Sequence, residues 1–255
     1  MEHPKKIKAA LMQPSFLPWQ GLFELIFNSD KFVFLDDFQF VVQSHHTRNK
    51  LFVNKNQVGY YGVPVQKSKC FQAKLNEVLI VENNQWKNKL IRTLENNYKK
   101  TPYFEKYAVN IINIINKDIK ILSELNITLI KEICSILNIN TEFLYSSDFT
   151  KETKSASQRS ERVAQILDWI GASRYLSAFG SFDYMKEDNF NFEKYDVIFQ
   201  NYIPKQYKQI QTDTFVPYLS VLDALFNIGA EETLMLIKNG TEKWLMPKER
   251  LELSI

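Results

Sequence analysis

Short apolar runs and a helix-periodic segment alternate in the first 40 residues of the chain. Residues 8–12 form an apolar run that stops at Gln13, and residues 31–35 form a second one that stops at Asp36 and Asp37. Between them, apolar residues recur at steps of three and four, as on one face of a helix. Strand, helix and strand in this order predict a βαβ unit, which is typical of a parallel α/β sheet.

The middle of the chain changes from strand-like to helical periodicity. Residues 38–65 are rich in β-branched and aromatic residues and predict a hairpin-like excursion, and residues 75–81 predict a further strand. From residue 85 onward, apolar residues recur at helical spacing. This predicts a largely helical insertion over about residues 85–138.

The last third of the chain returns to alternating strands and helices. No stretch rich in proline, glycine or serine divides the sequence, so we expect a single α/β domain over residues 1–255. Its sheet is expected to be mostly parallel, with helices on its flanks. The predicted strands cover residues 141–145, 174–179 and 196–200, and the predicted helices cover residues 157–169, 218–227 and 231–238.

Glycine is scarce, and this limits the kinds of ligand loop that the chain can form. Only 7 of the 255 residues are glycine, against about 7% in average proteins. Neither GxGxxG nor the P-loop pattern GxxxxGK[ST] occurs. We therefore expect a Rossmann-like fold in which side chains and helix ends, rather than a glycine-rich loop, hold any anion.

Charge and cysteine content exclude several classes of protein. The 32 basic and 29 acidic residues leave a net charge of +3, which argues against dedicated DNA binding. Cys70 and Cys134 are too few for a disulfide framework or a zinc cluster, and no metal site is predicted. No apolar run approaches the roughly 20 residues of a membrane span, and no signal core is visible, so we expect a cytoplasmic protein without membrane insertion.

Polar side chains follow both early strands at the edge where open parallel sheets bind ligands. Gln13 ends the first strand, and Asp36 and Asp37 end the second. The loop that starts at Gln13 contains two prolines and Trp19, and its stiffness suits a preformed pocket wall. The alternative is that Gln13 and Asp36 only satisfy the backbone of turns.

A second candidate is the segment that contains His45, His46, Arg48 and Asn49. Histidine changes charge near neutral pH and is the natural general base for an amine or hydroxyl nucleophile. We expect His46 to be this base, with one of the paired aspartates orienting it. Arg48 and Asn49 would then hold an anion or a developing oxyanion.

The start of the helix predicted from residue 157 is a candidate anion site. Ser157 offers a capping hydroxyl, and Arg159 and Arg162 lie close to the positive end of the helix dipole. The alternative is an ordinary solvated helix start. Ser177 opens a loop of small residues just past another predicted strand, with Gly180 and Ser181 behind it.

Motifs spread in order over about residues 8–230 resemble the WbqC-like protein family. The resemblance implies a bacterial protein of surface-polysaccharide (O-antigen) gene clusters, and it adds Tyr207 to the substrate-binding candidates. The family often has a histidine where this chain has Met12. The motifs include Met12-Gln-Pro-Ser-Phe-Leu-Pro-Trp-Gln-Gly, Asp30-Lys-Phe-Val-Phe-Leu-Asp-Asp, Gly171-Ala-Ser-Arg-Tyr-Leu-Ser, Tyr207-Lys-Gln-Ile and Phe215-Val-Pro-Tyr-Leu-Ser-Val-Leu-Asp-Ala.

The resemblance implies a transferase that attaches glycine or another amino acid to an amino sugar or a sugar nucleotide. Such an enzyme needs an activated aminoacyl donor, which the sequence leaves open among an aminoacyl-tRNA, a carrier-protein thioester and an acyl adenylate. An acyl carrier protein or a tRNA would then be a partner. Two other functions stay open: a nucleotidylyltransferase-like enzyme that releases pyrophosphate, and a non-catalytic scaffold of polysaccharide assembly.

Overall fold

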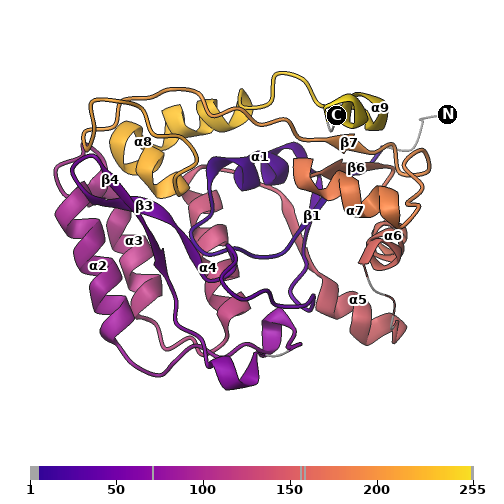
Figure 1. Ribbon diagram of the computed structural model, residues 1–255, viewed down its shortest axis with the longest axis horizontal. Coiled ribbons are helices and arrows are strands. Elements are labelled where there is room, and N and C mark those ends of the chain that lie inside the picture. Colours follow the sequence, from indigo (N-terminus) through magenta and orange to yellow (C-terminus); the bar gives the residue numbers. More distant parts are fainter. Residues whose placement is uncertain (1–5, 71, 156, 158, 254–255) are drawn as a thin grey trace.

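A five-stranded parallel sheet forms the centre of the protein in the computed structural model, which describes residues 6–70, 72–155, 157 and 159–253 (Figure 1). The strands lie in the order β5-β2-β1-β6-β7, and every neighbouring pair is parallel. This confirms the predicted Rossmann-like α/β fold. The strands are β1 (Lys8–Met12), β2 (Lys31–Phe34), β5 (Glu142–Tyr145), β6 (Arg174–Ser177) and β7 (Ile198–Phe199).

Helices cover both faces of the sheet. Figure 1 shows α5, α6 and α7 on one side of the strands, and the larger group of helices on the other side. The smaller group comprises α5 (Ser146–Thr153), α6 (Arg159–Trp169) and α7 (Phe182–Glu187). The larger group comprises α1 (Gln20–Asn28), α2 (Gln85–Tyr98), α3 (Phe104–Asn116), α4 (Leu122–Ile136) and α8 (Val221–Lys238), and α9 (Pro247–Glu252) follows near β7.

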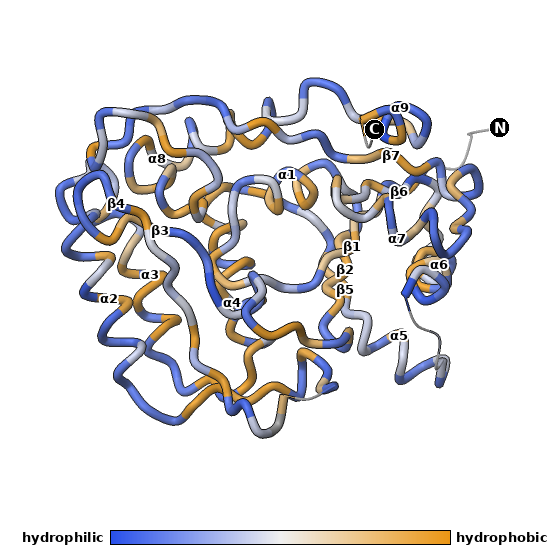
Figure 2. Tube along the Cα trace, viewed as in Figure 1, coloured by the Kyte–Doolittle hydropathy of each residue, from blue (hydrophilic) through white to orange (hydrophobic). Residues whose placement is uncertain are grey.

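The apolar runs of the strands divide their side chains between two cores. Ala9 and Leu11 of β1 pack into the cluster under α6 and α7, whereas Ala10 packs into the larger cluster on the opposite face. Val33 and Phe34 of β2 divide in the same way. Successive strand side chains point to opposite faces, so a strand that is buried on both faces reads as a continuous apolar run. Figure 2 shows this hydrophobic stretch along β1, β2 and β5.

The predicted hairpin is present, and the histidine pair lies in a turn before it. The hairpin consists of β3 (Arg48–Asn54) and β4 (Gln57–Gly62), which pair antiparallel. The strand predicted over residues 75–81 is wrong. A short 3-10 turn, Leu75–Glu77, replaces its start, because its backbone N–H groups donate to the loop after β2, at Asp36 and Phe38, instead of to a neighbouring strand.

The two helices predicted at the C-terminal end are joined into α8, with a break at Gly229. This residue has a φ of +81°, which favours glycine. A Cβ atom there would lie 2.8 Å from the ring of Tyr103, so the break also lets α8 approach the start of α3. Within the described residues, no helix has the length and apolar character that a bilayer span requires.

Candidate functional site

A pocket opens at the carboxyl edge of the sheet, between the ends of β1 and β6. Counted along the chain, the sheet strands have the order 3-2-1-4-5, so the direction of winding reverses between these two strands. Open α/β sheets bind ligands in the crevice at such a switch point. The pocket has a volume of about 530 Å³ and begins at Leu11, Met12 and Gln13 on one side and at Ala178 on the other.

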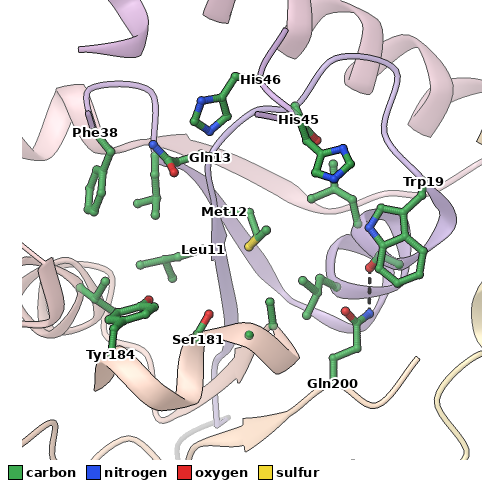
Figure 3. Close-up of a pocket in the computed structure, with 18 of the residues that line it drawn as sticks. Leu11, Met12, Gln13, Trp19, Phe38, His45, His46, Ser181, Tyr184 and Gln200 are labelled. Atoms are coloured by element: carbon green, nitrogen blue, oxygen red, sulfur yellow. Dashed lines mark hydrogen bonds between the residues drawn. The ribbon is translucent and has the colours of Figure 1, made fainter. Parts of the chain in front are cut away.

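The wall of this switch-point pocket combines aromatic rings with uncharged or basic polar groups (Figure 3). Trp19, Phe38 and Tyr184 supply the exposed aromatic surface. The described residues of the wall include no aspartate and no glutamate. The polar side chains of the wall belong to Gln13, Ser15, Trp19, His45, His46, Asn49, Arg159, Tyr175, Ser181, Tyr184 and Gln200.

Trp19 is a fixed part of the wall. Its ring lies across Gly21 of α1, where a Cβ atom would come within 2.3 Å of the indole. Tyr202 packs edge-on against the indole at a centroid distance of 5.1 Å, and Tyr218 lies 5.5 Å away. The indole is therefore held from three sides before any ligand arrives, as a preformed binding wall requires.

The two histidines have different environments. His45 is exposed, whereas the side chain of His46 is buried against Phe40. Burial, followed by the nearby charge of His45, lowers the pKa of His46 to about 4. The backbone N–H of Val41 donates to its Nδ1 at 3.4 Å. At neutral pH His46 is therefore an uncharged imidazole whose proton belongs on Nε2.

Buried asparagine side chains join the histidine turn to the loop after β1. Asn126 of α4 donates through Nδ2 to the carbonyl oxygen of Pro14 at 3.0 Å and to that of His46 at 2.8 Å. Asn49 donates to the carbonyl oxygens of residues 16 and 17 of the same loop. The two loops thus form one hydrogen-bonded wall of the pocket.

Arg159, at the start of α6, is the residue of the described wall that carries a guanidinium. Its side chain is 59% exposed and lies 3.2 Å from Asp188. A second cavity of about 480 Å³ adjoins the pocket, because Arg159 and Phe38 line both. This second cavity also contains Asp37 and Arg162.

The paired aspartates do not line the switch-point pocket. Asp36 accepts hydrogen bonds from the hydroxyl and the following N–H group at the start of α5. Asp37 accepts from the hydroxyls of Ser146 and Thr150 and forms an ion pair with Arg162. Burial acts to raise the pKa of Asp37, but these hydrogen bonds and the guanidinium outweigh it, and the pKa is lowered.

A family model described as the WbqC-like protein family matches residues 13–235 of the chain. The chain belongs to this family. It is 32% identical over 226 residues to the uncharacterized protein Rv1507c of Mycobacterium tuberculosis (strain ATCC 25618 / H37Rv). The aligned residues make up 88% of this chain and 95% of that protein. No solved structure matches the chain significantly.

Six of the residues that the sequence proposed as catalytic or substrate-binding line the pocket of this WbqC-like protein, and the other such candidates lie elsewhere. The six are Gln13, Trp19, His45, His46, Asn49 and Arg159; Gly180 and Ser181 of the predicted small-residue loop line it as well. The contacts of Asp36 and Asp37 are with α5 and α6 and do not include His46. Arg162 is buried in its ion pair with Asp37.

Four further candidates contact neighbouring protein groups outside the wall. The guanidinium of Arg48 covers the ring of Tyr60 on the hairpin. Ser157 shares hydrogen bonds with Ser155 and Gln165. The other two are Ser177, which is fully buried, and Tyr207, which donates to the buried Asp223 at 2.6 Å.

Phe38, Tyr184 and Gln200 are among the wall residues of the WbqC-like protein that sequence reasoning missed. A signal existed for Gln200, because it directly follows β7 just as Gln13 directly follows β1. Residues in this position lie at the ligand-binding edge of a parallel sheet. Phe38 and Tyr184 carry no comparable signal, since aromatic residues of this kind occur throughout the sequence.

Proposed function

We propose that this WbqC-like protein binds a sugar nucleotide in the switch-point pocket and transfers a glycine-type amino acid to an amine on its sugar. In this proposal the reaction belongs to bacterial surface polysaccharide (O-antigen) synthesis, as the family resemblance implies. The observation that carries the proposal is the pocket itself, which lies where Rossmann-like folds bind nucleotides and has aromatic walls with Arg159 at one side. Trp19 or Phe38 would stack on the base, and Arg159 would pair with a phosphate.

Amide formation fits the histidine pair if the two residues have separate roles. The amine nitrogen bonds to the acyl carbon, and the bond from that carbon to the oxygen or sulfur of the donor breaks. His45, the exposed imidazole, accepts the amine proton and returns it to the leaving oxygen or sulfur. His46 is uncharged and has Nε2–H available, so we assign it the stabilisation of the developing oxyanion, in place of the base role that the sequence suggested.

The proposal is tested by offering the purified protein a sugar nucleotide that bears a free amine, together with each of the three donor types in turn. Mass spectrometry of the sugar nucleotide then reports whether an aminoacyl group has been added. We expect transfer with one donor, and loss of transfer in His45→Ala. Gln85→Met, a change at an exposed position at the start of α2, is the control. Tight sugar-nucleotide binding without transfer from any donor would contradict the aminoacyl step.

The strand order and the histidine turn beside the pocket favour a second candidate, a nucleotidylyltransferase-like reaction. In that reaction a nucleoside triphosphate would bind with its phosphates near Arg159 and the histidines. The product would be a nucleotide conjugate together with pyrophosphate. Pyrophosphate release in the presence of a nucleoside triphosphate and a sugar phosphate separates this reaction from aminoacyl transfer.

A further inference from the structure

We infer that Gln13 and Gln200 form a pair of hydrogen-bond acceptors that recognises the hydroxyl or uncharged amino groups of the ligand's sugar. This inference rests on the proposed function and identifies the part of the pocket that recognises the sugar. The two glutamines follow two different strands, β1 and β7, and both line the switch-point pocket. Figure 3 shows their amide groups on either side of Met12.

The amide of Gln200 has one possible orientation. Its Nε2 donates to the carbonyl oxygen of Gly21 at 2.8 Å and to Oε2 of Glu24 at 2.6 Å (Figure 3 shows the first of these bonds). A flipped amide would place its oxygen against the Gly21 carbonyl oxygen, which can only accept. Glu24 is itself fixed, because the N–H and the hydroxyl of Thr241 both donate to it. Oε1 of Gln200 is therefore left for a ligand.

The amide of Gln13 is fixed by a similar argument. Its Nε2 donates to the backbone carbonyl oxygen of Gln39 at 3.0 Å. Because a carbonyl oxygen cannot donate, the nitrogen must lie on that side and Oε1 on the other. Within the described part of the chain, no hydrogen bond reaches Oε1 of Gln13 or Gln200. Gln200 thus presents only oxygen to a bound molecule, because both of its N–H groups are used, and Gln13 presents its oxygen beside one remaining N–H.

The chemistry of an amide oxygen suits an amine that has to react as a nucleophile. A carboxylate beside an amine favours the protonated ammonium form, which has no lone pair for attack. An amide oxygen accepts a hydrogen bond from the amine without carrying a full negative charge. The described wall contains no carboxylate, so two amide oxygens can position an amino or hydroxyl group while the amine stays uncharged.

The test measures binding of three ligands that share one nucleotide: UDP-glucosamine, UDP-glucose and UDP. Binding of wild-type protein is measured first to this series and to the same series with guanine or thymine as the base. The variants are then measured with the series that wild-type protein binds most tightly. Gln13→Met keeps the length of the side chain and removes the acceptor. We expect it to weaken binding of both sugar nucleotides about tenfold, and to leave binding of the bare diphosphate unchanged.

Gln200→Met makes the same change on the other side of the pocket, but it also removes a donor from the buried Glu24. Its folding is therefore checked by urea denaturation. Glu24→Gln is the second variant, because it keeps the shape of Glu24 and weakens the orientation of Gln200. We expect Glu24→Gln to reduce the preference for sugar nucleotides over the bare diphosphate, by a smaller factor than Gln200→Met does.

The outcomes separate this inference from the proposed function. If wild-type protein binds none of the nucleotides, the proposed function fails and this inference fails with it. If wild-type protein prefers sugar nucleotides and Gln13→Met keeps that preference in full, only this inference is overturned. The inference is also overturned if Gln13→Met weakens all three ligands equally, because the residue would then support the pocket without reading the sugar. Gln85→Met is again the matched control.

Discussion

The loops after β1 and β2 start from the same position in the fold and use it differently. Each has a polar residue within two positions of the end of a buried parallel strand. The amide nitrogen of Gln13, after β1, donates to one backbone carbonyl, and the amide oxygen remains in the pocket. Asp36 and Asp37, after β2, are 7% and 4% exposed and give their oxygens to α5 and α6.

The difference lies in the chemistry of the two side chains. A buried carboxylate carries a full charge, so it must be matched by several donors or a cation. Asp37 takes two hydroxyls and the guanidinium of Arg162, and little is left for a ligand. An amide needs no such compensation and can keep one acceptor free. At this sheet edge the neutral side chain is the one available for binding, and the charged pair holds the helices.

The largest effect is expected from Arg162→Met, which removes the cation from the β2 loop. Asp37 would be left as a buried carboxylate without a cation, and we expect the free energy of unfolding to fall by about 3–5 kcal/mol. Urea denaturation followed by circular dichroism measures this loss. The double variant Asp37→Asn, Arg162→Met should regain much of it. A loss below about 1 kcal/mol for the single variant would show that the pair is not structural.

The corresponding change near the β1 loop is Asn126→Leu. It leaves the carbonyl oxygens of Pro14 and His46 without their buried donor, so we expect a loss of about 2–3 kcal/mol. Because His46 lines the pocket and Pro14 lies between the lining residues Gln13 and Ser15, ligand binding should weaken as well. Asn110→Ala, on the exposed side of α3, is the control and should change stability by less than about 0.5 kcal/mol. Equal losses of stability in Asn126→Leu and Asn110→Ala would contradict the claim that Asn126 supports the pocket.

A smaller effect is expected from pH, through His46. Its pKa is about 4 in the folded protein and near 6.5 when unfolded, so the unfolded chain binds more protons between these values. Stability is therefore lost as pH falls, by about 2 kcal/mol between pH 7 and pH 5. His46→Gln should lack this part of the pH dependence in urea titrations.

Two buried carboxylates, Glu24 and Asp223, have raised pKa values and work in the opposite direction, so the comparison of wild-type protein with His46→Gln must cancel their contributions. Burial raises the pKa of Asp223 to about 6, so its contribution to stability is present at low pH and is lost as pH rises through that value. Both carboxylates are present in wild-type protein and in His46→Gln. The difference between the two proteins therefore reports His46 alone, and parallel pH profiles would contradict its lowered pKa.

Arg159→Met should have the smallest effect on stability. Its side chain is 59% exposed and its ion pairs are on the surface, so we expect a change within about 0.5 kcal/mol. Ligand binding should respond more strongly, with about tenfold weaker affinity for a nucleoside diphosphate if Arg159 pairs with a phosphate. Unchanged affinity, measured by calorimetry, would remove Arg159 from the proposed site. The contrast with Arg162 separates a ligand-facing arginine from a structural one.

The sheet and the position of Gln13 could be predicted from the sequence because both depend on local pattern. A continuous apolar run that stops at a polar residue identifies a buried strand and its end within a few residues. The roles of Asp36 and Asp37 depend on Ser146, Thr150 and Arg162, which lie more than 100 residues further along the chain. No local pattern contains that information.

The orientation of Gln200 was equally out of reach. It is determined by Gly21 and Glu24 on α1 and, through Glu24, by Thr241 near the C-terminal end. The strand over residues 75–81 failed for a related reason. Its apolar and β-branched residues suit a strand, but among the described residues its backbone groups bond to the loop after β2, within the 3-10 turn and in isolated bridges.

Asn126 has a consequence for attempts to shorten this protein. The helices α2 to α4 follow the hairpin and precede β5, so they look like a removable excursion from a minimal sheet domain. A trimmed version that joined the hairpin directly to β5 would lose the Asn126 amide, which bridges the carbonyls of Pro14 and His46, and would keep the bonds that Asn49 makes to the same loop. Such a miniature would need a substitute donor at that place before it could be expected to recognise the same molecules.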